Sequence, residues 1–189
     1  EGGRYTVLGD PTEACLLVSA QKAGLSLEDL EREMPRVREL PFESRRKRMT
    51  TIHQLKRPLD GASRVAFVKG APNEVVRLSD NYRTNGKVMP MSDEMRKSIM
   101  DANDGYAANG LRVLALAYRP LSPDDASIPR SMSDYTPENI ECGLTFVGLL
   151  VMQDPPRPEV ADAVAECRRA GIRVVMITGD YGLTALSIA

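Results

Sequence analysis

The 189-residue sequence lacks the features that define several large classes of protein. No apolar run approaches the ~20 residues needed to cross a bilayer, so no direct insertion into a membrane is expected. The formal net charge is −1, which argues against nucleic acid as a partner, because dedicated nucleic-acid binders carry a basic field. The sequence starts at Glu1 rather than Met and has no signal peptide. We therefore expect an excerpt of a longer protein that is soluble as a fragment.

Histidine and cysteine are also scarce. The single histidine, His53, lies in an expected strand, and one histidine without partners is not a catalytic constellation, so we interpret it as structural. The cysteines, Cys15, Cys142 and Cys167, are odd in number and have no short metal-binding spacing. We interpret them as small buried residues of a reducing compartment. The sequence also offers no paired nucleophile and base, so neither a metal site nor a catalytic residue is predicted within it.

The first three quarters of the sequence combine helix and strand patterns. Helices are predicted to begin at Asp10, Ser26 and Ser92, which are good N-caps. A further helix is predicted to start at Gly70-Ala71-Pro72. Strands are predicted over residues 36–42, 47–55, 63–69 and 111–118. Turn signals lie at residues 59–61 and 85–86. Strands joined mostly by short turns indicate an antiparallel sheet with helical hairpins packed on one side.

The pattern changes after a polar stretch at residues 120–137, which we interpret as a loop or linker. Residues 144–152 are almost continuously apolar, as expected of a strand buried on both faces. An amphipathic helix over 159–170 and a second apolar strand over 172–177 follow. This order predicts a β-α-β unit with a parallel sheet and a right-handed crossover.

The most distinctive stretch is Phe42-Glu43-Ser44-Arg45-Arg46-Lys47-Arg48-Met49. On a strand, alternate side chains would share a face, with the aromatic ring beside cations. An aromatic face beside cations suits a flat base that carries phosphates, because the ring stacks and the cations meet the charge. The alternative is an exposed edge strand that charge protects from pairing with other chains.

Three further places could hold an anion. Lys69-Gly70-Ala71-Pro72 puts a cation at a strand end, before glycine and a helix N-terminus. Thr178-Gly179-Asp180 follows the second apolar strand, where ligands of α/β sheets bind. Arg112 begins a strand. The alternatives are a solvated lysine, a plain turn and a surface charge.

Together these motifs resemble the cytoplasmic head of the type II P-type cation-transporting ATPases, most closely bacterial calcium pumps. The segments that carry the resemblance are Gly9-Asp10-Pro11-Thr12-Glu13, Phe42 to Met49, Lys69-Gly70-Ala71-Pro72, Leu111-Arg112-Val113-Leu114-Ala115, and Asp154-Pro155-Pro156-Arg157 with Ile177-Thr178-Gly179-Asp180. Each is weak by itself, but they occur in the family's order and span nearly the whole chain.

The resemblance implies two domains. Residues 1–142 would be most of an α+β nucleotide-binding domain, with an antiparallel sheet flanked by helix hairpins. Residues 143–189 would be part of an α/β phosphorylation domain of the haloacid-dehalogenase type. The implied partners are ATP and the phosphorylation, actuator and transmembrane domains of the same pump. The implied location is the cytoplasmic side of the cell membrane.

The resemblance also implies ATP as the ligand, with Mg²⁺ accompanying it in the full-length pump. The implied cofactor-binding residues are Glu13, Phe42, Lys47, Met49, Lys69, Gly70, Arg112 and Leu114. Phe42 would stack on adenine and Glu13 would lie near the adenine amino group. Lys69 would lie deep in the pocket, Gly70 would keep its floor open, and Arg112 would reach the phosphates.

The sequence departs from the family in ways that bear on activity. The phosphorylated aspartate of the Asp-Lys-Thr-Gly-Thr motif and the magnesium-binding Gly-Asp-Gly-Val-Asn-Asp motif are absent. Thr178, Gly179 and Asp180 would only border the phosphorylation site, and Asp154 would lie at the hinge. We therefore expect the fragment to bind nucleotide without turning it over. The alternatives are an interaction domain without nucleotide, or a capped phosphatase, which the missing nucleophilic aspartate argues against.

Overall fold

The computed structural model describes residues 10–153, 157–179 and 181–189, which form two compact units. The first unit contains the described residues up to Met91 together with Ala115–Gly148. The second contains Ser92–Leu114 and the described part of Leu149–Ala189. Two strands, β6 and β7, contribute residues to both units. The contiguous division into residues 1–142 and 143–189 stays a prediction.

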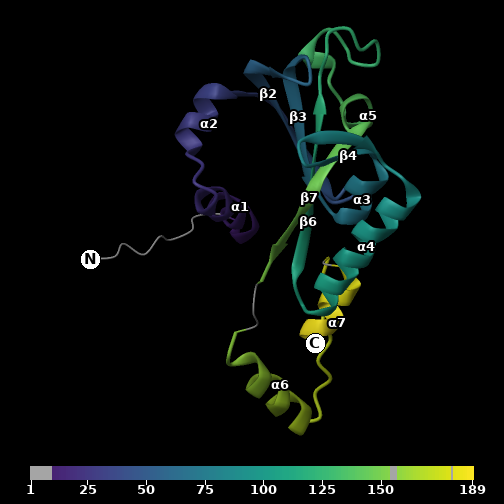
Figure 1. Ribbon diagram of the computed structural model, residues 1–189. Coiled ribbons are helices and arrows are strands. Elements are labelled where there is room, and N and C mark those ends of the chain that lie inside the picture. The colour runs from purple at the N-terminus through teal and green to yellow at the C-terminus, as the bar shows by residue number, and fades with distance from the viewer. Residues whose placement is uncertain (1–9, 154–156, 180) are drawn as a thin grey trace. The chain divides into compact units, whose positions relative to one another are not determined.

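A seven-stranded sheet forms the frame of the first unit, in the order β1-β2-β3-β6-β7-β4-β5 (Figure 1). Its strands are β1 (Arg36–Glu43), β2 (Arg48–Leu59), β3 (Ala62–Gly70), β4 (Ser79–Thr84), β5 (Lys87–Pro90), β6 (Arg112–Pro120) and β7 (Leu144–Met152). The expected α+β class is confirmed. A purely antiparallel sheet is wrong, because β4 and β7 pair in parallel. The long connection between these two strands allows them to run in the same direction.

Short helices complete the first unit. They are α1 (Pro11–Lys22), α2 (Leu27–Glu33), α3 (Pro72–Arg77), the 3₁₀ turn η1 (Met132–Asp134) and α5 (Pro137–Ile140). The predicted caps are confirmed for α1 and α2. The Asp10 carboxylate accepts from the Thr12 N–H at 2.8 Å, and the Ser26 hydroxyl accepts from the Asp29 N–H at 3.3 Å. Both contacts satisfy amide groups that have no partner within the helix.

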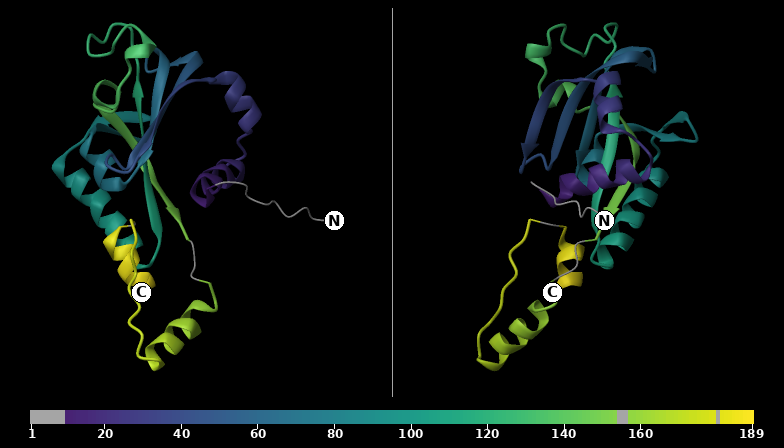
Figure 2. Two further views of the ribbon diagram at one scale, coloured as in Figure 1. Left: turned by 180° about the vertical axis from the view of Figure 1, so that it is seen from behind. Right: turned by 90° about the vertical axis from the view of Figure 1, so that its left-hand side faces the viewer.

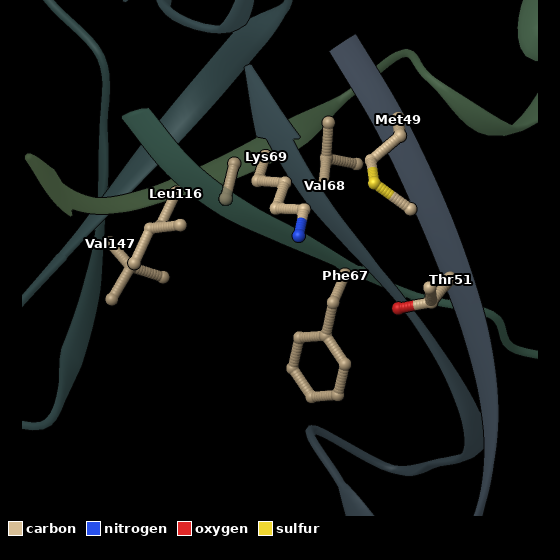
Figure 3. A pocket seen from close by; sticks show the side chains of 8 residues that line it. Met49, Thr51, Phe67, Val68, Lys69, Leu116 and Val147 are labelled. Atoms are coloured by element: carbon tan, nitrogen blue, oxygen red, sulfur yellow. The ribbon is translucent and has the colours of Figure 1, made fainter. Parts of the chain in front are cut away.

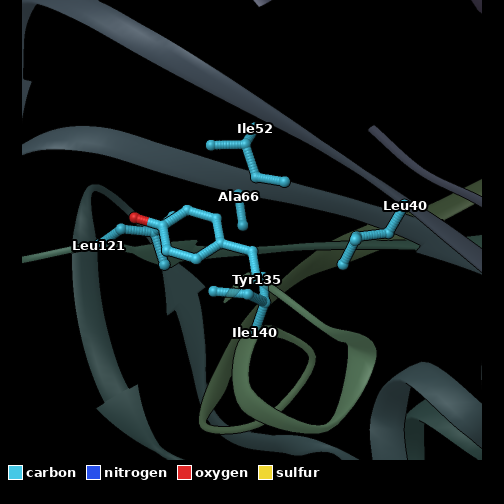
Figure 4. Packing of buried hydrophobic residues seen from close by; sticks show 6 residues of the cluster. All are labelled: Leu40, Ile52, Ala66, Leu121, Tyr135 and Ile140. Atoms are coloured by element: carbon cyan, nitrogen blue, oxygen red, sulfur yellow. The ribbon is translucent and has the colours of Figure 1, made fainter. Parts of the chain in front are cut away.

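Both faces of the sheet are covered, so the expectation of helices on one side is wrong. Helices α1 and α2 lie on one side and α5 on the other (Figures 1 and 2). On the α5 side, buried residues pack into a hydrophobic core (Figure 4). They are Leu40, Ile52, Ala66, Leu121, Tyr135 and Ile140. Leu121 and Tyr135 come from the stretch at residues 120–137, which we expected to form a loop. It is mostly irregular, but its apolar residues pack against the sheet.

The second unit contains α4 (Asp93–Ala108), α6 (Val160–Arg169) and α7 (Gly182–Ile188). The predicted helices over 92–109 and 159–170 are confirmed, and Ser92 caps α4 by accepting from the Met95 N–H at 3.2 Å. Helix α7 was not predicted. It contacts the rest of this unit through the Thr184 hydroxyl, which donates to the Leu111 carbonyl at 3.2 Å.

The predicted strand over 172–177 is wrong. These residues form no strand, and they are exposed, with Val175 at 68% and Ile177 at 94%. A strand needs a hydrogen-bonded neighbour, and its expected partner β7 lies between β6 and β4 instead. The predicted β-α-β unit and haloacid-dehalogenase-like segment are therefore not seen in the described residues. Asp154 and Asp180, predicted to lie at the hinge and the phosphorylation site, are outside those residues.

The expectation of three buried cysteines is also wrong. Cys15 is exposed, and Cys142 and Cys167 are half-buried. For Cys15 the reason is that helix α1 has no buried residue at all. Across residues 10–153, 157–179 and 181–189, no helix is both long and apolar enough to cross a membrane.

Candidate functional site

A pocket of about 290 Å³ lies in the first unit and is formed by strands β2, β3, β6 and β7. We call it the Lys69 pocket (Figure 3). It is lined by Met49, Thr51, Phe67, Val68, Lys69, Leu116, Ala117 and Val147. Six of these residues are apolar. The polar side chains are a hydroxyl, which can donate and accept, and an ammonium, which can only donate. Such a pocket suits a flat apolar body with a polar edge.

Strand pairing places these side chains together. Met49 lies opposite Lys69, and Thr51 lies opposite Phe67 in the antiparallel β2–β3 ladder. On the next strand, Leu116 lies opposite Lys69. Because side chains alternate across a sheet, Met49 and Thr51 share one face, while Thr50 and Ile52 point to the other. The pocket therefore lies on the opposite face from the Ile52 core.

The Lys69 ammonium forms an ion pair with the Glu13 carboxylate of helix α1. The side chain of Lys69 is 22% exposed and that of Glu13 is 52% exposed. An ion pair with such an exposed carboxylate is worth little to stability, so a ligand can displace Glu13 at small cost. Two residues predicted to bind the same ligand, 56 positions apart in sequence, are thus in direct contact.

His53 does not line the pocket, but it contacts two residues that do. Its Nδ1 lies 2.8 Å from the Met34 carbonyl oxygen, and its Nε2 lies 3.0 Å from the Thr51 hydroxyl oxygen. Its ring meets the Phe67 ring edge-on, with the ring centroids 5.4 Å apart. His53 therefore fixes two pocket side chains, Thr51 and Phe67.

The four cations at residues 45–48 lie in and at the end of a turn, so the alternation of side chains that a continuous strand would give does not apply to them. Residues 44–47 connect β1 and β2, and Glu43 pairs with Arg48 across the turn. Lys47 adopts φ +51°, which is uncommon outside glycine and breaks the alternation of a strand. As a result Arg45 and Lys47 are exposed, whereas the other two cations are turned inward.

Arg46 and Arg48 bind a buried carboxylate that the sequence analysis missed. Arg46 Nη1 donates to Glu141 Oε1 at 2.5 Å, and Arg48 Nε donates to Glu141 Oε2 at 2.7 Å. The Thr50 hydroxyl also donates to Glu141, whose side chain is 0% exposed. Burial by itself lowers the pKa of Arg46, but the hydrogen bond and the charge of Glu141 outweigh burial and raise that pKa.

One signal in the sequence indicated that Glu141 could be buried, namely its position between the apolar residues Ile140 and Cys142. The run of four cations at residues 45–48 is far from it in sequence. A partner 95 residues away cannot be identified from such a pattern. The contact makes Arg46 and Arg48 structural residues, and leaves Arg45 and Lys47 as the cations of the turn that face solvent.

Gly70 lies against the end of the same turn. A Cβ atom added there would come within 2.5 Å of Arg48 Cβ and 2.6 Å of the Lys47 carbonyl oxygen. The next residue, Ala71, donates its N–H to that carbonyl at 2.9 Å. The glycine thus allows β3 to approach the turn closely.

The other predicted site residues are dispersed. Phe42 is 63% exposed near the end of β1 and does not line the Lys69 pocket. Arg112 and Leu114 belong to the second unit. Thr178 and Gly179 are exposed in an irregular segment. Among the described residues, no group of three or more His, Cys, Asp or Glu side chains could hold a metal ion.

Comparison with known families identifies the class. Residues 1–159 match the family described as "P-type ATPase, cytoplasmic domain N". Because the match covers most of the chain, the chain belongs to this family.

Curated relatives agree with this assignment. The chain is 37% identical over 97% of its length to the calcium-transporting ATPase 1 of Lactococcus lactis. It is 39% identical over 99% to the calcium-transporting ATPase of Bacillus subtilis, and 40% identical over 100% to a cation-transporting ATPase of Synechocystis. It spans about a fifth of the length of these relatives, with 19%, 20% and 19% of each covered.

Proposed function

We propose that this chain binds ATP in the Lys69 pocket and holds it for transfer of a phosphoryl group to an aspartate elsewhere in a longer cation pump. The observation that carries the proposal is an apolar pocket with one ammonium group, in a chain of the P-type ATPase domain N family. The rest of that pump, with its phosphorylation, actuator and transmembrane domains, is the proposed partner. The proposed location is the cytoplasmic side of the cell membrane.

In this proposal the base enters the pocket and the phosphates stay near its mouth. Met49, Phe67 and Leu116 offer apolar contact to a purine. The Lys69 ammonium leaves Glu13 and meets a polar edge of the nucleotide, while Glu13 remains close enough to accept from an amino group. Lys47 and Arg45 are solvent-facing cations that can meet phosphate charge.

Gly70 acts indirectly, because it lets β3 approach the turn that carries Lys47. Arg112 and Leu114 are proposed to reach the nucleotide as well, as the family resemblance implies. Thr178 and Gly179 are proposed to border the phosphorylation site. The described residues offer Mg²⁺ no ligand cluster. In this proposal the ion arrives bound to the phosphates of ATP.

Calorimetric titration of the chain with ATP is the direct test. Saturable binding with one site per chain is expected. No binding at millimolar ATP would overturn the proposal and leave a domain that interacts with other proteins. Hydrolysis of a generic aryl phosphate by the chain would instead favour the phosphatase alternative.

Phe42 does not line the Lys69 pocket, and only the family resemblance implies that it stacks on the base. If it does, replacing Phe42 with alanine weakens ATP binding without destabilising the protein. Stacking of a base on an aromatic ring is worth ~1–3 kcal/mol, which is roughly a fivefold to hundredfold loss of affinity. The ring is 63% exposed, so little packing is lost. Tyr106→Ala, which removes another exposed aromatic, is the matched control. Equal affinities for Phe42→Ala and wild type by calorimetry would exclude the stacking role.

ATP is expected to protect Lys69 from an amine-directed reagent. A ligand that fills the pocket covers the Lys69 side chain, which is otherwise 22% exposed. Lys87, exposed on β5, is the internal control and should label equally with and without ATP. Peptide mapping after limited labelling measures both sites in one sample. Unchanged labelling of Lys69 at saturating ATP would place the nucleotide elsewhere.

A further inference from the structure

We propose that Thr51, held by His53, selects nucleotides whose base carries an amino group, and so distinguishes ATP from its 6-oxo counterpart. The inference rests on the proposed function, because it concerns the same pocket. It assigns a specificity role to Thr51 and a positioning role to His53, the histidine that the sequence analysis interpreted as structural.

The first step is the protonation of His53. A carbonyl oxygen only accepts hydrogen bonds, so Nδ1, 2.8 Å from the Met34 carbonyl oxygen, must carry a proton. A neutral imidazole has one proton, so Nε2 is then bare and can only accept. The edge-on contact with Phe67 holds the ring in this orientation. The Met34 backbone therefore selects the tautomer of His53.

The second step is the orientation of the Thr51 hydroxyl. Its oxygen lies 3.0 Å from the bare Nε2, so the hydroxyl proton must point at His53. Figure 3 shows Thr51 with its oxygen turned toward Phe67, on the same face as Lys69. With its proton committed to His53, Thr51 presents only lone pairs to a ligand in the pocket. A hydroxyl that could otherwise donate or accept becomes an acceptor.

The third step combines Thr51 with the other polar group. Lys69 has donors and no acceptor, so the lining residues offer one acceptor and one donor. Glu13 is not among the lining residues, and its carboxylate is left to accept the second proton of an amino group. The edge of adenine has the complementary pair, an amino donor beside ring-nitrogen acceptors. A 6-oxo purine has an acceptor where adenine has the amino group. Its oxygen would face the Thr51 lone pairs, and both groups would be left without a partner.

The occupant of this part of the pocket is the base rather than the triphosphate. The remaining walls are apolar, and Lys69 is the one cation among the lining residues. Several negative charges would lose their hydration there with little compensation, whereas a base buries its faces at no such cost.

The test compares ATP, inosine triphosphate and purine riboside triphosphate by calorimetry on the full chain. Wild type is expected to bind ATP on the order of tenfold or more tightly than inosine triphosphate. Purine riboside triphosphate, which lacks the amino group without adding an oxygen, should fall between them. Thr51→Val should reduce the ATP preference to about threefold or less, because the acceptor is lost.

Two variants control the experiment. Thr51→Ser keeps the hydroxyl and should keep the preference. Thr84→Val makes the same change on an exposed strand position and should change nothing. An unchanged preference in Thr51→Val would overturn the inference. Absence of ATP binding in wild type would instead overturn the proposed function, so the two failures are distinguishable.

A further variant tests the role of His53 separately. His53→Phe keeps a ring at this position but removes Nε2, so the Thr51 hydroxyl becomes free to donate as well as to accept. The preference for ATP over inosine triphosphate should therefore fall in His53→Phe. If His53→Phe binds the two nucleotides with the wild-type ratio of affinities, His53 does not orient Thr51, and the positioning role is wrong.

Discussion

Glu141→Ala is expected to lower the free energy of unfolding by about 3–5 kcal/mol, because removing one partner of a buried ion pair leaves the other uncompensated. Here a single carboxylate, 0% exposed, satisfies both Arg46 and Arg48. Without it Arg46 keeps only the exposed Glu43 as a charged partner, and Arg48 keeps only Glu74 at 3.5 Å. Denaturation by urea, followed by circular dichroism, measures the change.

The matched control is Glu43→Ala, which removes an exposed partner of the same Arg46. Exposed pairs contribute less than about 1 kcal/mol, so this variant should be nearly as stable as wild type. Similar losses in Glu43→Ala and Glu141→Ala would show that the buried network is not the cause.

A compensated variant separates the lost charge from the lost packing. Combining Glu141→Leu with Arg46→Met and Arg48→Met replaces the three charged members of the network by apolar groups. Such replacements are often neutral or stabilising, so much of the stability lost in Glu141→Ala should return. A triple variant as unstable as Glu141→Ala would show that contacts other than the Glu141 ion pairs, such as the hydrogen bond from Arg46 to the Pro41 carbonyl, hold the turn.

Gly70→Ala is the second substitution with a large expected effect. The added Cβ would lie 2.5 Å from Arg48 Cβ and 2.6 Å from the Lys47 carbonyl oxygen, so strand β3 or the turn must move. Overpacking of this kind costs ~1–3 kcal/mol, and the obstacle here includes backbone, which yields less easily than a side chain. The hydrogen bond from the Ala71 N–H to Lys47 should also lengthen.

Gly148→Ala is the control, because Gly148 also lies in a strand of the first unit and a Cβ there would meet no atom within 4 Å. It should be neutral or slightly stabilising, since alanine restricts the unfolded chain more than glycine does. Urea denaturation of both variants gives the comparison. A Gly70→Ala protein as stable as Gly148→Ala would mean that the turn can move freely, and that Gly70 does not position Lys47.

Local signals in the sequence predicted local structure. The caps at Asp10, Ser26 and Ser92 and the turn at 85–86 depend on residues a few positions apart, and all are confirmed. Strands β4 and β5 were missed, although their turn was predicted, because their burial does not alternate regularly. The strand over 172–177 was overpredicted, because apolar character signals a need for burial and not the presence of a partner strand.

The sequence alone determined the family and the α+β class, since these depend on residue types in a fixed order. It also supplied a short set of residues that we propose to bind a nucleotide. Only the tertiary structure decided how those residues are used. It brought Glu13 to Lys69, Glu141 to Arg46 and Arg48, and the Met34 carbonyl to His53. The longest of these contacts join residues 56 and 95 positions apart, and they arise from strand order and from the packing of α1 and α5. No pattern within a single segment encodes such distances, because each contact depends on two faces of a sheet that exist only after the strands have paired.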